Sequence, residues 1–123
     1  MNAEQSDRIW RMAIDAARRG HLDSLRTSVE TKLFDRNRPD HRGMTLLHHA
    51  VAAEIERAWS ERRGRAYVDC VAYLLIADVD FTVRDVEGRT AEDIASMNGH
   101  WLAEGLLRAW ARLHGAGLPS EIS

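Results

Sequence analysis

The sequence predicts an all-α protein made of three stacked helix-turn-helix units, of which the second has elongated helices. Apolar residues recur at helical spacing almost throughout the 123 residues. The motif Asp-x-x-Gly-x-Thr occurs at residues 40–45 and again at 85–90, and a Gly-His pair occurs at 20–21 and at 99–100. Once an insertion of about 12 residues is allowed, these offsets fit a repeat of about 33 residues, a period typical of stacked supersecondary units.

Each unit is predicted to contribute two helices whose buried faces follow from the apolar spacing. Ser6 is the expected N-cap of the first helix, and Gly20 is expected to end it. The first unit should bury Ile9, Ala13, Ala16 and Ala17, then Leu22, Leu25, Val29 and Leu33. The second should bury Leu47, Val51, Ile55, Ala58 and Trp59, then Tyr67, Val71, Leu74 and Leu75. The third should bury Ala91, Ile94 and Ala95, then Leu102, Leu106, Trp110 and Leu113.

The turns between these helices contain residues suited to tight geometry. Gly43 and Gly88 suit positions that need a positive φ. Thr45 and Thr90 can cap the helices that follow them.

These motifs give the chain a resemblance to ankyrin-repeat proteins over about residues 8–112. Residues 40–50 follow the family's Asp-x-x-Gly-x-Thr-Pro-Leu-His opening, with Leu46 in place of proline, and residues 85–95 follow it less closely. The resemblance implies one domain over residues 1–114, with units at about 6–39, 40–84 and 85–114, and a flexible tail at 115–123. It also implies that His48 is half buried and hydrogen-bonded to backbone across units. Asp78 replaces a family glycine that takes a left-handed conformation, which aspartate tolerates better than most residues do.

The second unit has about 12 additional residues around 54–66. Because the apolar stripe continues past Val51, the first helix of this unit is expected to run two turns longer, with a turn at 62–65. The charges from Glu54 onward suit a solvated face. Two interpretations stay open: a self-packed helical hairpin, or a projecting contact feature anchored by Trp59 and Tyr67.

The charge pattern argues against a strongly basic nucleic-acid binder. The net charge is −2, but residues 1–65 contain 13 basic and 10 acidic side chains, whereas residues 66–123 contain 4 and 9. Only Lys32 among the 17 basic residues is a lysine, which points to a GC-rich coding sequence and a bacterial source. No signal-peptide pattern and no apolar stretch of about 18 residues is visible, so a cytoplasmic location and no membrane partner are expected.

The sequence shows no pattern of a catalytic, cofactor or metal site, so none is expected and the protein is predicted not to be an enzyme. The single cysteine, Cys70, lies in an apolar stretch and is predicted to be a buried, inert thiol. His48 and His49 are adjacent, so they point about 100° apart on a helix and cannot share a metal. Trp10, Trp101 and Trp110 are assigned core or capping roles.

The ankyrin resemblance implies a concave binding face formed by turn tips and first helices. Its candidate partner-binding residues, with Trp59 added from the insertion, are Arg18, Arg19, Arg38, His41, Arg42, Met44, Trp59, Arg84, Val86, Glu87, Arg89, Met97 and Asn98. Most of the charged members are basic, and arginine suits bidentate recognition of carboxylates. One protein partner with an acidic surface is therefore expected, and the free protein is expected to be a monomer.

The sequence thus predicts non-catalytic protein–protein recognition by rigid docking. The sharper hypothesis, drawn from small bacterial proteins of similar type, is an immunity or self-protection inhibitor that neutralises a toxic enzyme of the same cell. The alternatives are a regulatory adaptor or assembly scaffold and, less favoured, nucleic-acid binding through the arginine-rich edge.

Overall fold

The structure is a computed structural model that describes residues 3–61 and 68–114, and the side chains of 58–61 lie outside the described set. The predicted tail at 115–123, the anchors Trp59 and Tyr67, and the turn at 62–65 therefore fall outside the described residues. The described residues form six helices and no strand: α1 (Ala3–Arg19), α2 (Leu22–Glu30), α3 (Leu46–Glu61), α4 (Asp69–Ile76), α5 (Ala91–Met97) and α6 (Trp101–His114).

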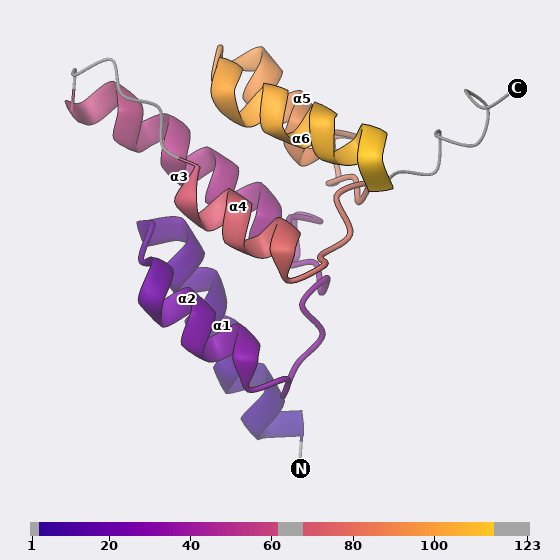
Figure 1. The fold of residues 1–123 in the computed structure, drawn as a ribbon. Helices are drawn as coiled ribbons and strands as arrows, with labels where there is room; N and C mark the ends of the chain where they lie inside the picture. The colour runs from indigo at the N-terminus through magenta and orange to yellow at the C-terminus, as the bar shows by residue number, and fades with distance from the viewer. Residues whose placement is uncertain (1–2, 62–67, 115–123) are drawn as a thin grey trace, which may run out of the picture.

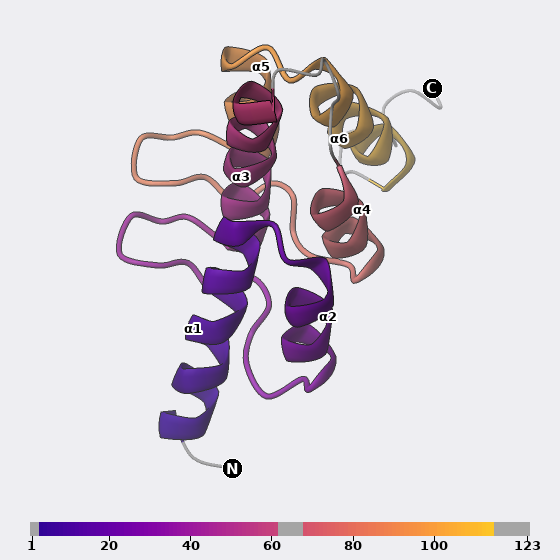
Figure 2. The ribbon, with the colours of Figure 1, turned by 90° about the vertical axis from the view of Figure 1, so that its left-hand side faces the viewer.

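The helices stack as three antiparallel pairs (Figure 1). Figure 2 shows that α1, α3 and α5 form one row and that α2, α4 and α6 form a second row beside it. Contacts run within each pair and between neighbouring pairs along both rows. The predicted all-α solenoid is therefore confirmed. The first helix of the second unit, α3, has 16 residues against 7 in α5 and 17 in α1. The prediction that both helices of this unit are elongated is wrong for α4, which has 8 residues.

Most of the predicted buried positions of the first five helices form the core, whereas Ile9, Leu22 and Leu33 are only half buried. The side chains of Ala58, Trp59 and Tyr67 lie outside the described residues. Ala13, Ala16 and Ala17 of α1 and Val71, Leu74 and Leu75 of α4 are all buried. The prediction for α6 is wrong by one position, because its most buried apolar residues are Ala103 and Leu107. Trp110 is only half buried, and Leu113 is 72% exposed. Large residues lie on both sides of the buried stripe of α6, which contains the small residue Ala103 and Leu107.

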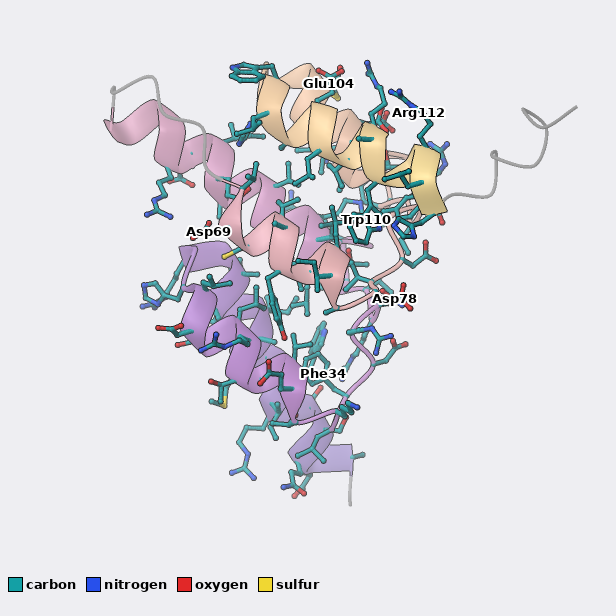
Figure 3. All side chains as sticks on the ribbon, in the orientation of Figure 1. Phe34, Asp69, Asp78, Glu104, Trp110 and Arg112 are labelled. Carbon is teal, nitrogen blue, oxygen red and sulfur yellow. The ribbon has the colours of Figure 1, made fainter. Side chains whose placement is uncertain are left out.

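Two predictions at the ends of helices are also wrong. Helix α1 begins at Ala3, so Ser6 lies within the helix and is not its N-cap. Trp101 is 71% exposed at the start of α6 and has no core role. The other two tryptophans with described side chains, Trp10 and Trp110, are half buried, and Figure 3 labels Trp110. Trp10 lies under the guanidinium of Arg38, and Trp110 packs against the His114 ring.

Two loops project side by side beyond α1 and α3 (Figure 2). We call residues 32–45 the upstream loop and residues 77–90 the downstream loop. The repeated motif folds both tips alike: Asp40 Oδ1 accepts hydrogen bonds from the amides of residues 42 and 44, and Asp85 Oδ1 accepts them from the amides of 87 and 89, all at 2.9 Å. The expected positive φ occurs at Gly43 (76°), Gly88 (78°) and Asp78 (67°).

No helix within the described ranges combines the length and the apolar character that crossing a membrane requires.

Candidate functional site

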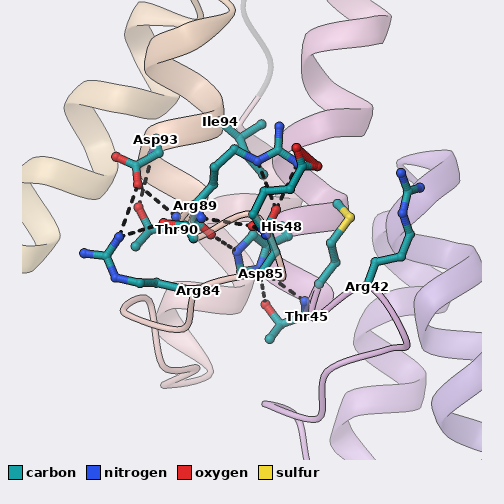
Figure 4. Close-up of polar contacts among 12 residues, drawn as sticks. Arg42, Thr45, His48, Arg84, Asp85, Arg89, Thr90, Asp93 and Ile94 are labelled. Atoms are coloured by element: carbon teal, nitrogen blue, oxygen red, sulfur yellow. Dashed lines mark hydrogen bonds and ion pairs between the residues drawn. The ribbon is translucent and has the colours of Figure 1, made fainter.

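A buried histidine connects the second unit to the third. His48 is 1% exposed, and its Nδ1 accepts a hydrogen bond from the Thr45 amide at 3.2 Å. The same ring nitrogen lies 2.9 Å from the Thr45 hydroxyl. Because Nδ1 is an acceptor, Nε2 bears the ring hydrogen and donates it to the carbonyl oxygen of Arg89 at 2.9 Å (Figure 4). The predicted cross-unit hydrogen bond is confirmed, and the ring is more deeply buried than expected.

The first turns of α3 and α5 differ in their capping. Thr90 caps α5 as predicted: its hydroxyl accepts from the Asp93 amide at 3.1 Å, and the Asp93 carboxylate accepts from the Thr90 amide at 3.0 Å. At the start of α3, the hydroxyl of Thr45 instead faces the His48 ring. The histidine therefore occupies the place that an acidic residue has in the capping box of α5.

The tips of the two loops are in direct backbone contact. The amide of Val86 donates a hydrogen bond to the carbonyl oxygen of Arg42 at 2.9 Å. A Cβ atom added to Gly43 would lie 2.8 Å from the Val86 nitrogen and 2.9 Å from the Asp85 Cα. Glycine is therefore needed here for its small size as well as for its positive φ. The two tips form one continuous, rigid edge.

Several predicted binding residues remain exposed. We call this set the recognition face; its members are Arg18, His41, Arg42, Val86, Met97 and Asn98. Val86 is 71% exposed and Met97 67% exposed. The Arg42 guanidinium makes no hydrogen bond or ion pair with any described residue, and Figure 4 shows it standing apart from the bonded cluster. Met44 is half buried.

Other predicted binding arginines have partners inside the chain. Arg38 forms an ion pair with Asp7 at 2.8 Å while its guanidinium stacks on Trp10 at 3.8 Å. Arg89 pairs with Asp85 at 3.0 Å and with Glu87 at 3.2 Å. Arg84 donates to the Gly88 carbonyl at 2.7 Å, and Arg19 pairs with Asp15 at 3.2 Å. These arginines hold the loops and α1 in place, which narrows the face available to a partner.

Hydrogen bonds within the protein stabilise the ionised form of the two tip aspartates, Asp40 and Asp85. Burial by itself would raise the pKa of Asp40, but hydrogen bonds from His49 and from the amides of residues 44 and 42 hold that pKa below its ordinary value. Burial likewise opposes ionisation of Asp85, yet the hydrogen bonds from Arg89 and Glu87 lower its pKa. Burial lowers the pKa of His49, and the nearby charge of Arg18 lowers it further, against the effect of Asp40.

A buried acidic residue, Glu54, contradicts the sequence interpretation. It was expected on a solvated face of α3, but it is only 1% exposed. Its Oε2 accepts hydrogen bonds from the amides of Cys70 at 3.0 Å and Val71 at 3.3 Å, so it caps the start of α4. Burial raises its pKa to about 8, although these two amides act in the opposite direction. The sequence contains one signal of this burial, because Glu54 lies three residues after the buried Val51 and therefore on the same face of the helix.

Cys70 lies beside Glu54 and is fully buried, as predicted. Burial raises the pKa of its thiol to about 12, and the charges of Asp69 and Glu54 add to the effect. A thiol in this state is a poor nucleophile.

Comparison with known proteins agrees with this architecture. The family model for ankyrin repeats (many copies) matches residues 13–54. The fold is similar to a chain in the structure of a predatory endopeptidase from Bdellovibrio bacteriovorus in complex with an immunity protein, at a TM-score of 0.67 and 24% identity over 80% of this chain and 45% of that chain. It is also similar to an ankyrin repeat domain from Acinetobacter baumannii, at a TM-score of 0.67 and 27% identity over 80% and 46%.

This chain therefore spans slightly less than half the length of both matched chains. No curated protein matches it in sequence. The paired helices, the two tips with their repeated Asp-x-x-Gly-x-Thr geometry, and the match of the family model over residues 13–54 lead to one conclusion: the chain has the ankyrin-repeat fold.

Proposed function

We propose that this protein is an immunity protein that binds a toxic enzyme of the same cell and neutralises it. Ankyrin repeats are protein-recognition modules, and one structure with a similar fold contains an immunity protein in complex with an endopeptidase. The main support for the proposal is the recognition face. The two loop tips that contribute to it are joined by a backbone hydrogen bond, and the Arg42 guanidinium has no partner within the described chain.

The mechanism is rigid docking onto an acidic surface. The tips are already fixed by their internal hydrogen bonds, so little conformational entropy is lost when they bind. Arg42 and Arg18 would pair with carboxylates of the enzyme, and arginine does so bidentately. Val86 and Met97, both largely exposed, would supply the apolar contacts at the centre of the interface. By covering the substrate cleft of the enzyme, the protein would inhibit it without any covalent reaction.

The direct test is to purify the protein together with the toxic enzyme encoded beside it and to measure complex formation and enzyme activity. We expect a stable complex and loss of activity. The double variant Arg18→Glu/Arg42→Glu should weaken binding about 100-fold, because each attraction becomes a repulsion. The control, Arg26→Glu/Arg112→Glu, changes the charge equally at exposed positions of the outer helices α2 and α6 and should bind like the wild type.

Each other outcome has a definite meaning. Absence of a complex would contradict the immunity proposal. A complex that leaves the enzyme fully active would identify the protein as an adaptor or scaffold instead. Equal loss of affinity in the test and control variants would mean that the recognition face is not the contact surface.

A further inference from the structure

We propose that Glu54, Asp69 and Cys70 form a binding site for one thiophilic divalent cation of the zinc type. One carboxylate oxygen from each acidic residue and the Cys70 Sγ lie within 4.8 Å of one another. The site joins the middle of α3 to the first turn of α4, where Asp69 lies (Figure 3). Glu54 lines the same surface pocket as Arg18 of the recognition face. The inference does not depend on the proposed function.

The second observation is an unsatisfied buried atom at this place. Glu54 is 1% exposed, and its Oε2 already accepts two amide hydrogen bonds. Its Oε1 is buried and has no hydrogen-bond partner among the described residues. A buried carboxylate oxygen without a partner is costly, and capping of α4 explains only the other oxygen. A cation bound to Oε1 would satisfy it.

The ligand set fits zinc better than it fits magnesium or calcium. A thiolate with two carboxylates is a mixed sulfur and oxygen set, which borderline-soft cations accept and hard cations avoid. In a tetrahedral zinc site the ligand atoms lie about 3.5 Å apart, so a small side-chain rotation would close the present spacing. Cys70 and Glu54 are buried, whereas Asp69 is exposed and would provide the route from solvent.

A divalent cation would also balance the charge of its ligands. Two carboxylates and a thiolate together place three negative charges in one partly buried space. Cation binding would release the thiol proton of Cys70 to solvent, as the S–H bond gives way to a bond to the metal.

The test uses the full chain after removal of metals by a chelator, titrated with Cd²⁺ as the probe. We expect an ultraviolet thiolate-to-cadmium charge-transfer band that saturates at one equivalent. Cys70→Ser should abolish the band, and Asp69→Asn should weaken binding about tenfold or more. Because Asp69 is exposed, its variant should fold normally, and circular dichroism checks this. The matched control is Glu56→Gln, an exposed acid on α3 outside the cluster, which should titrate like the wild type.

A parallel measurement uses Zn²⁺ and thermal unfolding. Zinc should raise the Tm of the wild type and of Glu56→Gln but not that of Cys70→Ser or Asp69→Asn. If the folded protein shows no charge-transfer band, the proposal is overturned. A band that Asp69→Asn leaves unchanged would also overturn it, because cadmium would then be binding the lone thiol.

Discussion

At the scale of single residues, the two tip aspartates show how one side chain can define a turn. Asp40 and Asp85 each accept two amide hydrogen bonds from residues two and four positions later. The sequence motif predicts this equivalence because the glycine and the threonine occur at matching positions. It does not predict that Arg38 reaches Asp7 and Trp10, because that pairing depends on distances across the fold. The pair of Arg89 with Asp85 is local, since the two residues are four positions apart in the same loop.

The lowered pKa of Asp85 leads to a pH-dependent prediction. A carboxyl group with a pKa below its unfolded value stabilises the fold above the unfolded pKa, about 3.9, and loses that contribution as the pH falls through the folded pKa. Asp85→Asn should therefore lower the free energy of unfolding at pH 7 by about 1–3 kcal/mol, and the deficit should shrink at acidic pH. Urea unfolding at both pH values measures it. Asp23→Asn, at a side chain 92% exposed, is the control and should show no such convergence.

At the scale of elements, the two loops act as one edge because their tips touch. Both Gly43 and Gly88 have a positive φ, but only Gly43 faces the backbone of the other loop at close range. At Gly88, no atom lies within 4 Å of an added Cβ. Substitutions at these two glycines therefore separate the effect of backbone conformation on stability from the effect of contact between the loops.

We expect Gly88→Ala to cost about 1–2 kcal/mol of stability, which is the strain of a left-handed alanine. Gly43→Ala should cost about 1–3 kcal/mol more, because the added methyl group forces the tips apart and breaks the Val86–Arg42 hydrogen bond. Chemical denaturation measures both values. Equal costs would show that the contact between the tips contributes nothing to stability.

The six helices also show where sequence reasoning stops. Their existence and most buried faces follow from apolar spacing, which depends on local geometry alone. The register of α6 does not follow, because large residues on both sides of Ala103 make several faces equally apolar. The position of Glu54 does not follow either: a charge on α3 is read as solvated unless the start of α4 is known to need a cap. Both errors concern packing between elements that are distant in sequence.

At the scale of the whole molecule, each unit depends on its neighbours for a core. Buried residues from all six helices form one continuous cluster. His48 adds a polar connection from α3 to the carbonyl of Arg89 at the end of the downstream loop. Because no unit can bury its apolar face alone, the stack should unfold as a single cooperative system.

The coupling can be tested by removing the His48 ring. His48→Ala should lower the free energy of unfolding by about 2–4 kcal/mol, because it leaves buried amide and carbonyl groups unpaired. His41→Ala, at an exposed tip position, should change stability by less than about 0.5 kcal/mol. Urea unfolding followed by circular dichroism and by tryptophan fluorescence should give one shared midpoint for the wild type. Separate midpoints would contradict cooperative unfolding.

The contact between the two tips gives the loop edge a polarity. The upstream tip supplies the acceptor, the Arg42 carbonyl oxygen, and the downstream tip supplies the donor, the Val86 amide. The exposed side chains differ in the same way, because Arg42 is cationic and Val86 is apolar. A protein bound to this edge therefore meets a charge at one tip and an apolar side chain at the other, so it cannot be turned end to end and still fit.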